Sequence, residues 1–146
     1  MDVIFDLDGT LADLTHRRHF IESRPKRWDD FFKAAHRDTV IEPIARCARN
    51  FALGNRVIIC SGRPDSLRDV TEKWLSKMWG AACNHAALYM RKAGDYRPDD
   101  IVKSELLDRI LADGYRPELV FDDRRRVVDM WRRRGLICAQ VAEGDF

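Results

Sequence analysis

The chain has 146 residues, of which 26 are Lys or Arg and 24 are Asp or Glu, so its formal net charge is only +2. This length fits one domain that buries a real core without disulfides or metals as staples. The balance of charge excludes a general electrostatic attraction to nucleic acid or to anionic membranes, so any anion must be bound by a local group of cations.

Short apolar runs alternate with longer amphipathic runs along the chain. The first run, a strand over 3–6, is followed by a polar and aromatic stretch that is too long for an ordinary connection. We expect a small helical cap there, over about residues 14–42. After it the pattern predicts a helix over 43–53, a strand over 57–60, a helix over 67–78, a strand over 88–90, a helix over 101–111, a strand over 119–121, a helix over 127–131 and a strand over 136–141.

This alternation predicts an α/β fold, with a Rossmann-like parallel sheet of about five strands flanked by helices and joined by right-handed crossovers. We expect residues 1–146 to form a single domain. No apolar run reaches 18 residues, so no membrane span is expected. The four cysteines share no C-x-x-C spacing, which favours reduced thiols in a cytoplasmic protein.

Polar residues gather where the predicted strands end, which is where ligands bind in open parallel sheets. They are Asp6, Asp8, Gly9 and Thr10 after the first strand, Ser61, Gly62 and Arg63 after the second, and Asp122 and Asp123 after the fourth, with Lys103 on the helix that follows the third. An isolated D-x-D is more often a turn or a helix cap than a catalytic pair. Sites after several strands, however, are expected to converge on one edge of the sheet.

Metal-assisted phosphoryl transfer is the chemistry that needs this set. Clustered carboxylates are costly without a cation, and hard oxygen ligands favour Mg²⁺, which Asp6, Asp8 and Asp122 could bind. An aspartate can also attack phosphorus and form an aspartyl-phosphate, while its neighbour two residues on protonates the departing oxygen. Ser61 and Lys103 would bind the phosphoryl oxygens, and Thr10 and Gly62 are further candidates for phosphate contacts.

The strings D-L-D-G-T-L, I-I-C-S-G-R and F-D-D, together with Lys103, resemble the four motifs of the haloacid dehalogenase (HAD) superfamily of phosphotransferases. The stretches SGRPD, GDYRPDDIVKSEL, FDDRRRVVDMWRRRG and QVAEGDF are similar to the phosphatase domain of bacteriophage-type polynucleotide kinase/phosphatase, nearly from end to end. The resemblance implies a Mg²⁺-dependent 3′-phosphatase for DNA or RNA ends in a phage or in the cytosol of its bacterial host. It implies Asp6 as nucleophile, Asp8 as general acid and base, and Asp122 and Asp123 as support for the metal.

The resemblance also implies roles for residues outside the strand ends. Arg63 and Arg17 match arginines that contact the phosphate or its nucleic-acid carrier, although Arg18 could serve in place of Arg17. Asp99 matches an acid that orients the side chain of Lys103. The sequence has no G-x-x-x-x-G-K-[ST] loop, so we expect this chain to remove phosphates without a kinase activity of its own.

Several alternatives stay open at this point. A nucleotidase or another small-molecule phosphatase of the same superfamily would need the same motifs, and a phosphomutase uses the same aspartate pair. A non-catalytic binding domain is disfavoured, because every motif residue needed for chemistry is present. DNA, RNA and mononucleotide substrates are not distinguished, and a homo-oligomer and a separate kinase partner are both left open.

Other conspicuous residues have less specific explanations. Trp28, Phe31 and Phe32 could stack on bases, but their helical spacing more often marks the core of a small cap. The arginines at 124–126 and 132–134 could follow a nucleic-acid strand. Because they spread around one predicted helix, we expect most of them to be solvated, with Arg124 nearest to the active edge.

Overall fold

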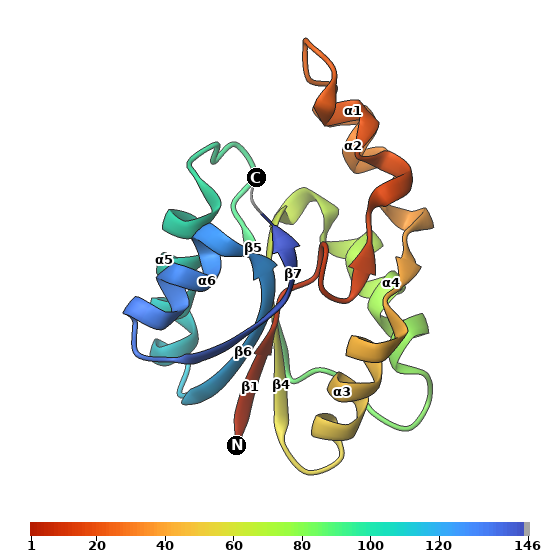
Figure 1. The fold of residues 1–146 in the computed structure, drawn as a ribbon. Coiled ribbons are helices and arrows are strands. Elements are labelled where there is room, and N and C mark those ends of the chain that lie inside the picture. Colours follow the sequence, from red (N-terminus) through yellow and green to blue (C-terminus); the bar gives the residue numbers. More distant parts are fainter. Residues whose placement is uncertain (145–146) are drawn as a thin grey trace.

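The computed structural model describes residues 1–144, which are built around a five-stranded parallel sheet. Its strands are β1 (Asp2–Phe5), β4 (Arg56–Pro64), β5 (Ala87–Arg91), β6 (Pro117–Arg124) and β7 (Ile137–Gly144). They lie in the order β5-β4-β1-β6-β7, with the first strand of the chain in the centre (Figure 1). The parallel sheet of about five strands predicted from the sequence is therefore confirmed.

Helices cover both faces of this sheet (Figure 1). Helices α3 (Glu42–Ala52) and α4 (Arg68–Trp79) pack on one face, and α5 (Asp99–Ala112) and α6 (Arg125–Arg133) pack on the other. Successive residues of a strand point to opposite faces. Accordingly, Val3 and Phe5 belong to the apolar cluster under α3 and α4, whereas Ile4 belongs to the cluster under α5 and α6. A strand with both faces buried is apolar without interruption, and this is the pattern that marked β1 in the sequence.

The segment between β1 and α3 forms a cap above the carboxyl ends of the strands (Figure 1). It contains the short helices η1 (Thr15–Arg17), α1 (His19–Glu22), α2 (Trp28–Lys33) and η2 (Ala35–Arg37). An antiparallel pair, β2 (Ala12–Asp13) and β3 (Thr39–Val40), joins the two ends of the cap. Strands of two residues carry no periodic signal, so the sequence did not predict this pair. The remaining short helix, η3 (Asp65–Leu67), connects β4 to α4.

Strands β4 and β6 extend beyond their predicted ends and carry site residues with them. Ser61, Gly62 and Arg63 lie within β4, and Asp122 and Asp123 lie within β6. Their positions on sheet strands hold these side chains on a rigid support. Within residues 1–144, no helix combines the length and the apolar character that crossing a membrane would require.

Candidate active site

The loop after β1 places the first aspartate against the neighbouring strand. The backbone N–H of Asp6 donates to the carbonyl of Phe121 on β6 at 2.9 Å. The chain then turns around the carbonyl of Leu7, which accepts the backbone N–H groups of residues 10, 11 and 12. Gly9 has a φ of +84°, and a Cβ there would lie 2.3 Å from Oδ2 of Asp123. The glycine is required both for the turn and for the approach of the Asp123 carboxylate.

Three buried carboxylates, one from the loop after β1 and two from β6, meet at this edge. Asp6, Asp122 and Asp123 each offer an oxygen, and these oxygens all lie within 4.8 Å of one another. Lys103, from α5, reaches the same place: its Nζ donates to Oδ1 of Asp6 at 2.6 Å and to Oδ2 of Asp122 at 3.0 Å. The fold thus brings together residues that are about a hundred positions apart, as expected from their places at the strand ends.

The charges at this place are not balanced. Burial raises the pKa of Asp6 well above its usual value, and the charges of Asp122 and Asp123 add to the effect, against that of Lys103. Burial and the charge of Asp122 likewise raise the pKa of Asp123. Burial disfavours the charged form of Lys103, but the charges of Asp122 and Asp6 outweigh it and raise the pKa of the ammonium. One ammonium faces three carboxylates, so the set has the charge and the oxygen donors that suit Mg²⁺.

Further hydrogen bonds orient the two carboxylates that contact Lys103. Thr10 donates from Oγ1 to Oδ2 of Asp6 at 3.1 Å. Asp122 accepts the backbone N–H of Arg124 and the indole N–H of Trp131, both at 3.1 Å. Trp131 is fully buried, as expected for a residue that packs a helix on the sheet, and it also fixes the direction of the Asp122 carboxylate.

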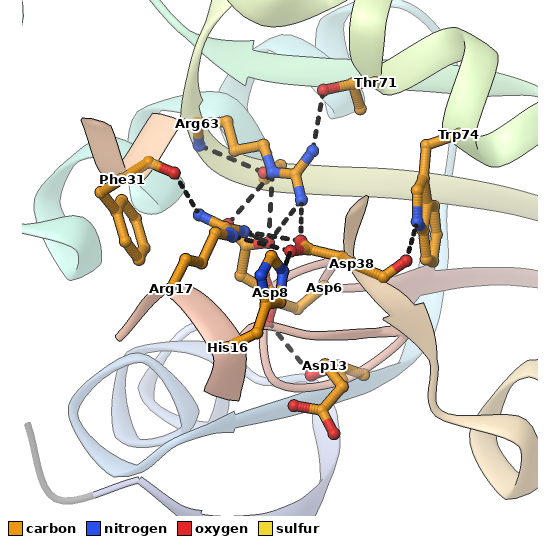
Figure 2. A network of polar contacts seen from close by, with 12 residues as sticks. Asp6, Asp8, Asp13, His16, Arg17, Phe31, Asp38, Arg63, Thr71 and Trp74 are labelled. Atoms are coloured by element: carbon orange, nitrogen blue, oxygen red, sulfur yellow. Dashed lines mark hydrogen bonds and ion pairs between the residues drawn. The ribbon is translucent and has the colours of Figure 1, made fainter. Parts of the chain in front are cut away.

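Asp8 faces a pair of arginines (Figure 2). Arg63 donates from Nη2 to Oδ1 of Asp8 at 2.7 Å and from Nε at 3.1 Å. Arg17 donates from Nη2 to the same oxygen at 2.9 Å. Burial opposes ionisation of Asp8, but the charge and hydrogen bonds of Arg63 and the charge of Arg17 prevail, and the pKa of Asp8 lies below its usual value. The carboxylate of Asp8 therefore binds the two arginines and lies outside the group of three carboxylates that suits a metal.

The sequence did not single out Asp38, which lies between η2 and β3 and holds both arginines from the side of the cap (Figure 2). Its carboxylate is fully buried and accepts from Nε and Nη2 of Arg17, each at 2.7 Å, and from Nη2 of Arg63 at 2.9 Å. Nε2 of His16 lies 2.7 Å from its Oδ1. The backbone carbonyl of Asp38 accepts the indole N–H of Trp74, on α4, at 2.8 Å. The cap is thereby fixed to the core at the active edge.

Arg17 and Arg63 are buried, whereas the neighbouring Arg18 is exposed. The side chain of Arg17 is fully buried, and its guanidinium lies over the ring of Phe31, 4.2 Å from the centroid. Arg63 is equally buried and also donates to Oγ1 of Thr71. Arg18, the alternative to Arg17, is 45% exposed and lies near Glu22. The structure thus brings Arg17, and not Arg18, to Asp8.

The remaining predicted residues line the same edge. Oγ of Ser61 accepts the backbone N–H of Arg63 at 3.1 Å, which leaves the hydroxyl hydrogen for another acceptor. A Cβ on Gly62 would lie 2.1 Å from Oδ1 of Asp99, so this glycine allows the carboxylate to approach. Asp99 lies 4.0 Å from Nζ of Lys103 and accepts from Arg91 at 2.8 Å. Its position fits the predicted influence on Lys103.

The chain is similar to several known proteins. The family described as the polynucleotide kinase PNKP phosphatase domain matches residues 1–146. A protein of Autographa californica nuclear polyhedrosis virus, described as a putative bifunctional polynucleotide kinase/RNA ligase, is 30% identical over 132 residues, which are 89% of this chain and 17% of the viral protein. A solved structure of a Pnkp1/Rnl/Hen1 complex contains a chain that is 38% identical, with a TM-score of 0.81, over 99% of this chain and 47% of that chain.

The fold itself is shared more widely. The structure of L-2-haloacid dehalogenase from Xanthobacter autotrophicus superimposes with a TM-score of 0.62 at 16% identity, over 96% of this chain and 76% of the dehalogenase. At that identity the likeness concerns the fold alone. This chain spans less than half the length of the viral relative and of the matched chain in the Pnkp1/Rnl/Hen1 complex.

Proposed function

Because the chain belongs to the family of the polynucleotide kinase PNKP phosphatase domain, we propose that it is a Mg²⁺-dependent phosphatase that removes 3′-phosphates from DNA or RNA ends. The observation that carries this proposal is the pairing of two aspartates with different surroundings. Asp6 is held by Lys103 beside two further carboxylates, whereas Asp8, two residues on, is held by two arginines. One aspartate can act as nucleophile while the other transfers protons.

In the first step an oxygen of Asp6 attacks the phosphorus atom, and the bond between phosphorus and the 3′ oxygen of the sugar breaks. Asp8 gives its proton to that oxygen. In the free protein the arginines hold the pKa of Asp8 down and keep it ionised. A phosphate dianion competes for the guanidinium groups of Arg17 and Arg63, which weakens their hold on Asp8 and favours uptake of the proton that it then donates.

In the second step water attacks the phosphorus of the aspartyl-phosphate. Asp8, now ionised, takes a proton from this water, and the departing Asp6 carboxylate is restored as inorganic phosphate forms. Lys103, Ser61 and Thr10 donate to the phosphoryl oxygens, where negative charge accumulates in both transition states. Thr10 and Lys103 already contact Asp6, and Ser61 lies on β4, the strand next to β1.

Asp6, Asp122 and Asp123 would hold the metal ion. When bound, Mg²⁺ supplies the positive charge that the carboxylates and the phosphate together require. The pKa values of Asp6 and Asp123, raised by burial and by neighbouring carboxylates, support this assignment. Asp8 was also predicted as a ligand, but its oxygens contact Arg17 and Arg63, so we propose only the acid and base role for it.

We propose the 3′-end of a polynucleotide as the substrate because the family and the viral relative are both described by polynucleotide kinases. Arg17 and Arg63 are both buried beside the general acid, and each guanidinium group can bind two oxygens at once. Together they can bind more oxygens than one phosphate group offers, which supports a substrate that extends beyond that group. Since the relatives are longer than this chain, a kinase or ligase activity next to it would come from other domains or chains.

Phosphate release from a panel of substrates tests the proposal. The panel contains a 3′-phosphorylated oligonucleotide, 3′- and 5′-mononucleotides and a sugar phosphate, each with and without Mg²⁺, and the Asp6→Asn variant controls for contaminating phosphatases. We expect the oligonucleotide with a 3′-phosphate to have the highest kcat/KM. If 5′-mononucleotides are hydrolysed faster, the protein is a nucleotidase and the proposal is wrong.

A further inference from the structure

Trp28, at the start of α2 in the cap, is the exposed tryptophan of this structure. It is 45% exposed, whereas Trp74, Trp79 and Trp131 are at most 7% exposed. The sequence predicted Trp28 as part of the core of the cap. That expectation is wrong for Trp28, although Phe31 on the same helix is indeed buried. Trp28 therefore presents part of its ring to solvent on the same cap that carries Arg17.

The ring is connected to the catalytic edge by direct contacts. Trp28 and Phe31 pack edge to face, with ring centroids 5.8 Å apart. Phe31 also contacts the guanidinium of Arg17, which lies 4.2 Å from its centroid, and Arg17 donates to Asp8. A strand whose 3′-phosphate lies at Asp6 would therefore pass the cap within its first few nucleotides.

The surroundings of the ring suit a nucleic-acid strand. Trp28 stacks on Phe32 at 5.8 Å with an angle of 25° between the ring planes, so its orientation is fixed. Nζ of Lys26 lies 5.5 Å from the Trp28 centroid. Proteins that bind single strands combine aromatic rings for the bases with cations for the phosphates. Trp28 supplies an aromatic ring and Lys26, two residues before it, supplies a cation.

The charge of the cap also favours this ligand. Residues 15–38 include seven Lys or Arg and four Asp or Glu, so this segment carries more than the whole net charge of +2. Asp38 and Arg17 are both buried and paired with each other, which leaves six basic and three acidic residues in this segment. The outer surface of the cap is accordingly more basic than the chain as a whole, which favours a polyanionic ligand.

We propose that Trp28 is a stacking platform for a base of the substrate strand, a few nucleotides from the 3′-phosphate, with Lys26 pairing with a phosphate of the same strand. This inference rests on the proposed 3′-phosphatase function and extends it. The protein then prefers an unpaired 3′-end of several nucleotides to a mononucleotide, because only the longer strand reaches Trp28.

The test compares kcat/KM of the wild type, Trp28→Ala and Trp28→Phe on a 3′-phosphorylated pentanucleotide, a 3′-mononucleotide and an aryl phosphate, at one fixed salt concentration. Trp28→Ala should lower kcat/KM for the pentanucleotide by about 5-fold to 100-fold more than for the aryl phosphate, which is the range expected for the loss of one base stacked on an aromatic side chain. Trp28→Phe should restore most of the loss.

The matched control is Tyr96→Ala. Tyr96 is 94% exposed and lies on the loop after β5, at the same edge of the sheet but outside the cap. It should leave all three rates unchanged. A selective loss in Tyr96→Ala, or an equal loss on all substrates in Trp28→Ala, would overturn the proposal.

Fluorescence provides a readout besides activity. In an Asp6→Asn background, the pentanucleotide should quench the emission of the exposed Trp28, and the quenching should disappear in Asp6→Asn combined with Trp28→Phe. Unchanged quenching in that double variant contradicts the platform. If the wild type fails to hydrolyse the pentanucleotide but hydrolyses mononucleotides, the proposed function is wrong, and this result is seen before any Trp28 variant is compared.

Discussion

Replacement of Asp38 by asparagine is the sharpest test of how the cap is fixed to the active site. The substitution keeps the size of the side chain but removes its charge. Arg17 and Arg63, whose side chains are at most 1% exposed, would then share only the carboxylate of Asp8. Since buried charges depend on paired partners, we expect the folded state to lose stability.

The magnitude follows from the contacts that are weakened. Removing one partner of a buried ion pair costs about 3 to 5 kcal/mol. The new amide would keep one oxygen as an acceptor, and Asp8 still binds both arginines, so we expect a cost at or below the lower end of that range. Asp38→Asn should reduce the free energy of unfolding by about 2 to 3 kcal/mol, which for a domain of this size lowers Tm by about 4 to 12 °C.

Urea unfolding followed by circular dichroism measures this change, with Asp29→Asn as the matched control. Asp29 is an exposed acid on the same cap, and its replacement should change the free energy by less than about 0.5 kcal/mol. If Asp38→Asn is as stable as Asp29→Asn, the buried network does not anchor the cap, and the role given to Asp38 is wrong.

Three further predictions concern the metal, Arg63 and the pH dependence of stability. Chelation by EDTA should abolish phosphate release and added Mg²⁺ should restore it, while Ca²⁺, with looser geometry, should support it poorly; full activity in EDTA would refute the metal assignment. Arg63→Lys should lower kcat/KM at least about 10-fold, because Lys replaces several directed hydrogen bonds with one point charge, and rates equal to the wild type would argue against the bidentate contact. Hydrogen bonds from Arg56 hold the pKa of Asp2 below its usual value of 3.8, so the stabilisation is full above that pH and is lost as the pH falls through the lowered pKa. The difference in unfolding free energy between the wild type and Asp2→Asn should therefore shrink as the pH falls below that usual value, and a difference that does not depend on pH would contradict the reasoning.

Much of the fold was predictable because the central strand β1 and the middle of β4 are buried on both faces. Residues 3–5 of β1 and 57–60 of β4 are apolar throughout, and the polar residues begin where the strands reach the edge. Parallel strands bring their carboxyl ends to one edge, so the meeting of Asp6 with Asp122 and Lys103 followed from topology. Long-range contacts became predictable here because the sheet fixes them.

The cap was less predictable, because no sheet fixes its residues. Asp38 follows a short helix and resembles any polar residue of a connection, yet it accepts hydrogen bonds from two buried arginines. The exposure of Trp28 depends on how α2 packs on its neighbours in the cap, which helical spacing alone does not determine. The two-residue strands β2 and β3 are set by the closure of the cap and not by a local pattern.

A single-turnover reaction with an oligonucleotide that carries a radiolabelled 3′-phosphate tests the central claim most directly. The reaction is quenched in acid within milliseconds, and the label bound to protein is located by proteolysis and sequencing. The account predicts transient label on the peptide that contains Asp6, with none in Asp6→Asn. Release of labelled phosphate without any label on the wild-type protein at any time, or label on another residue, would contradict it.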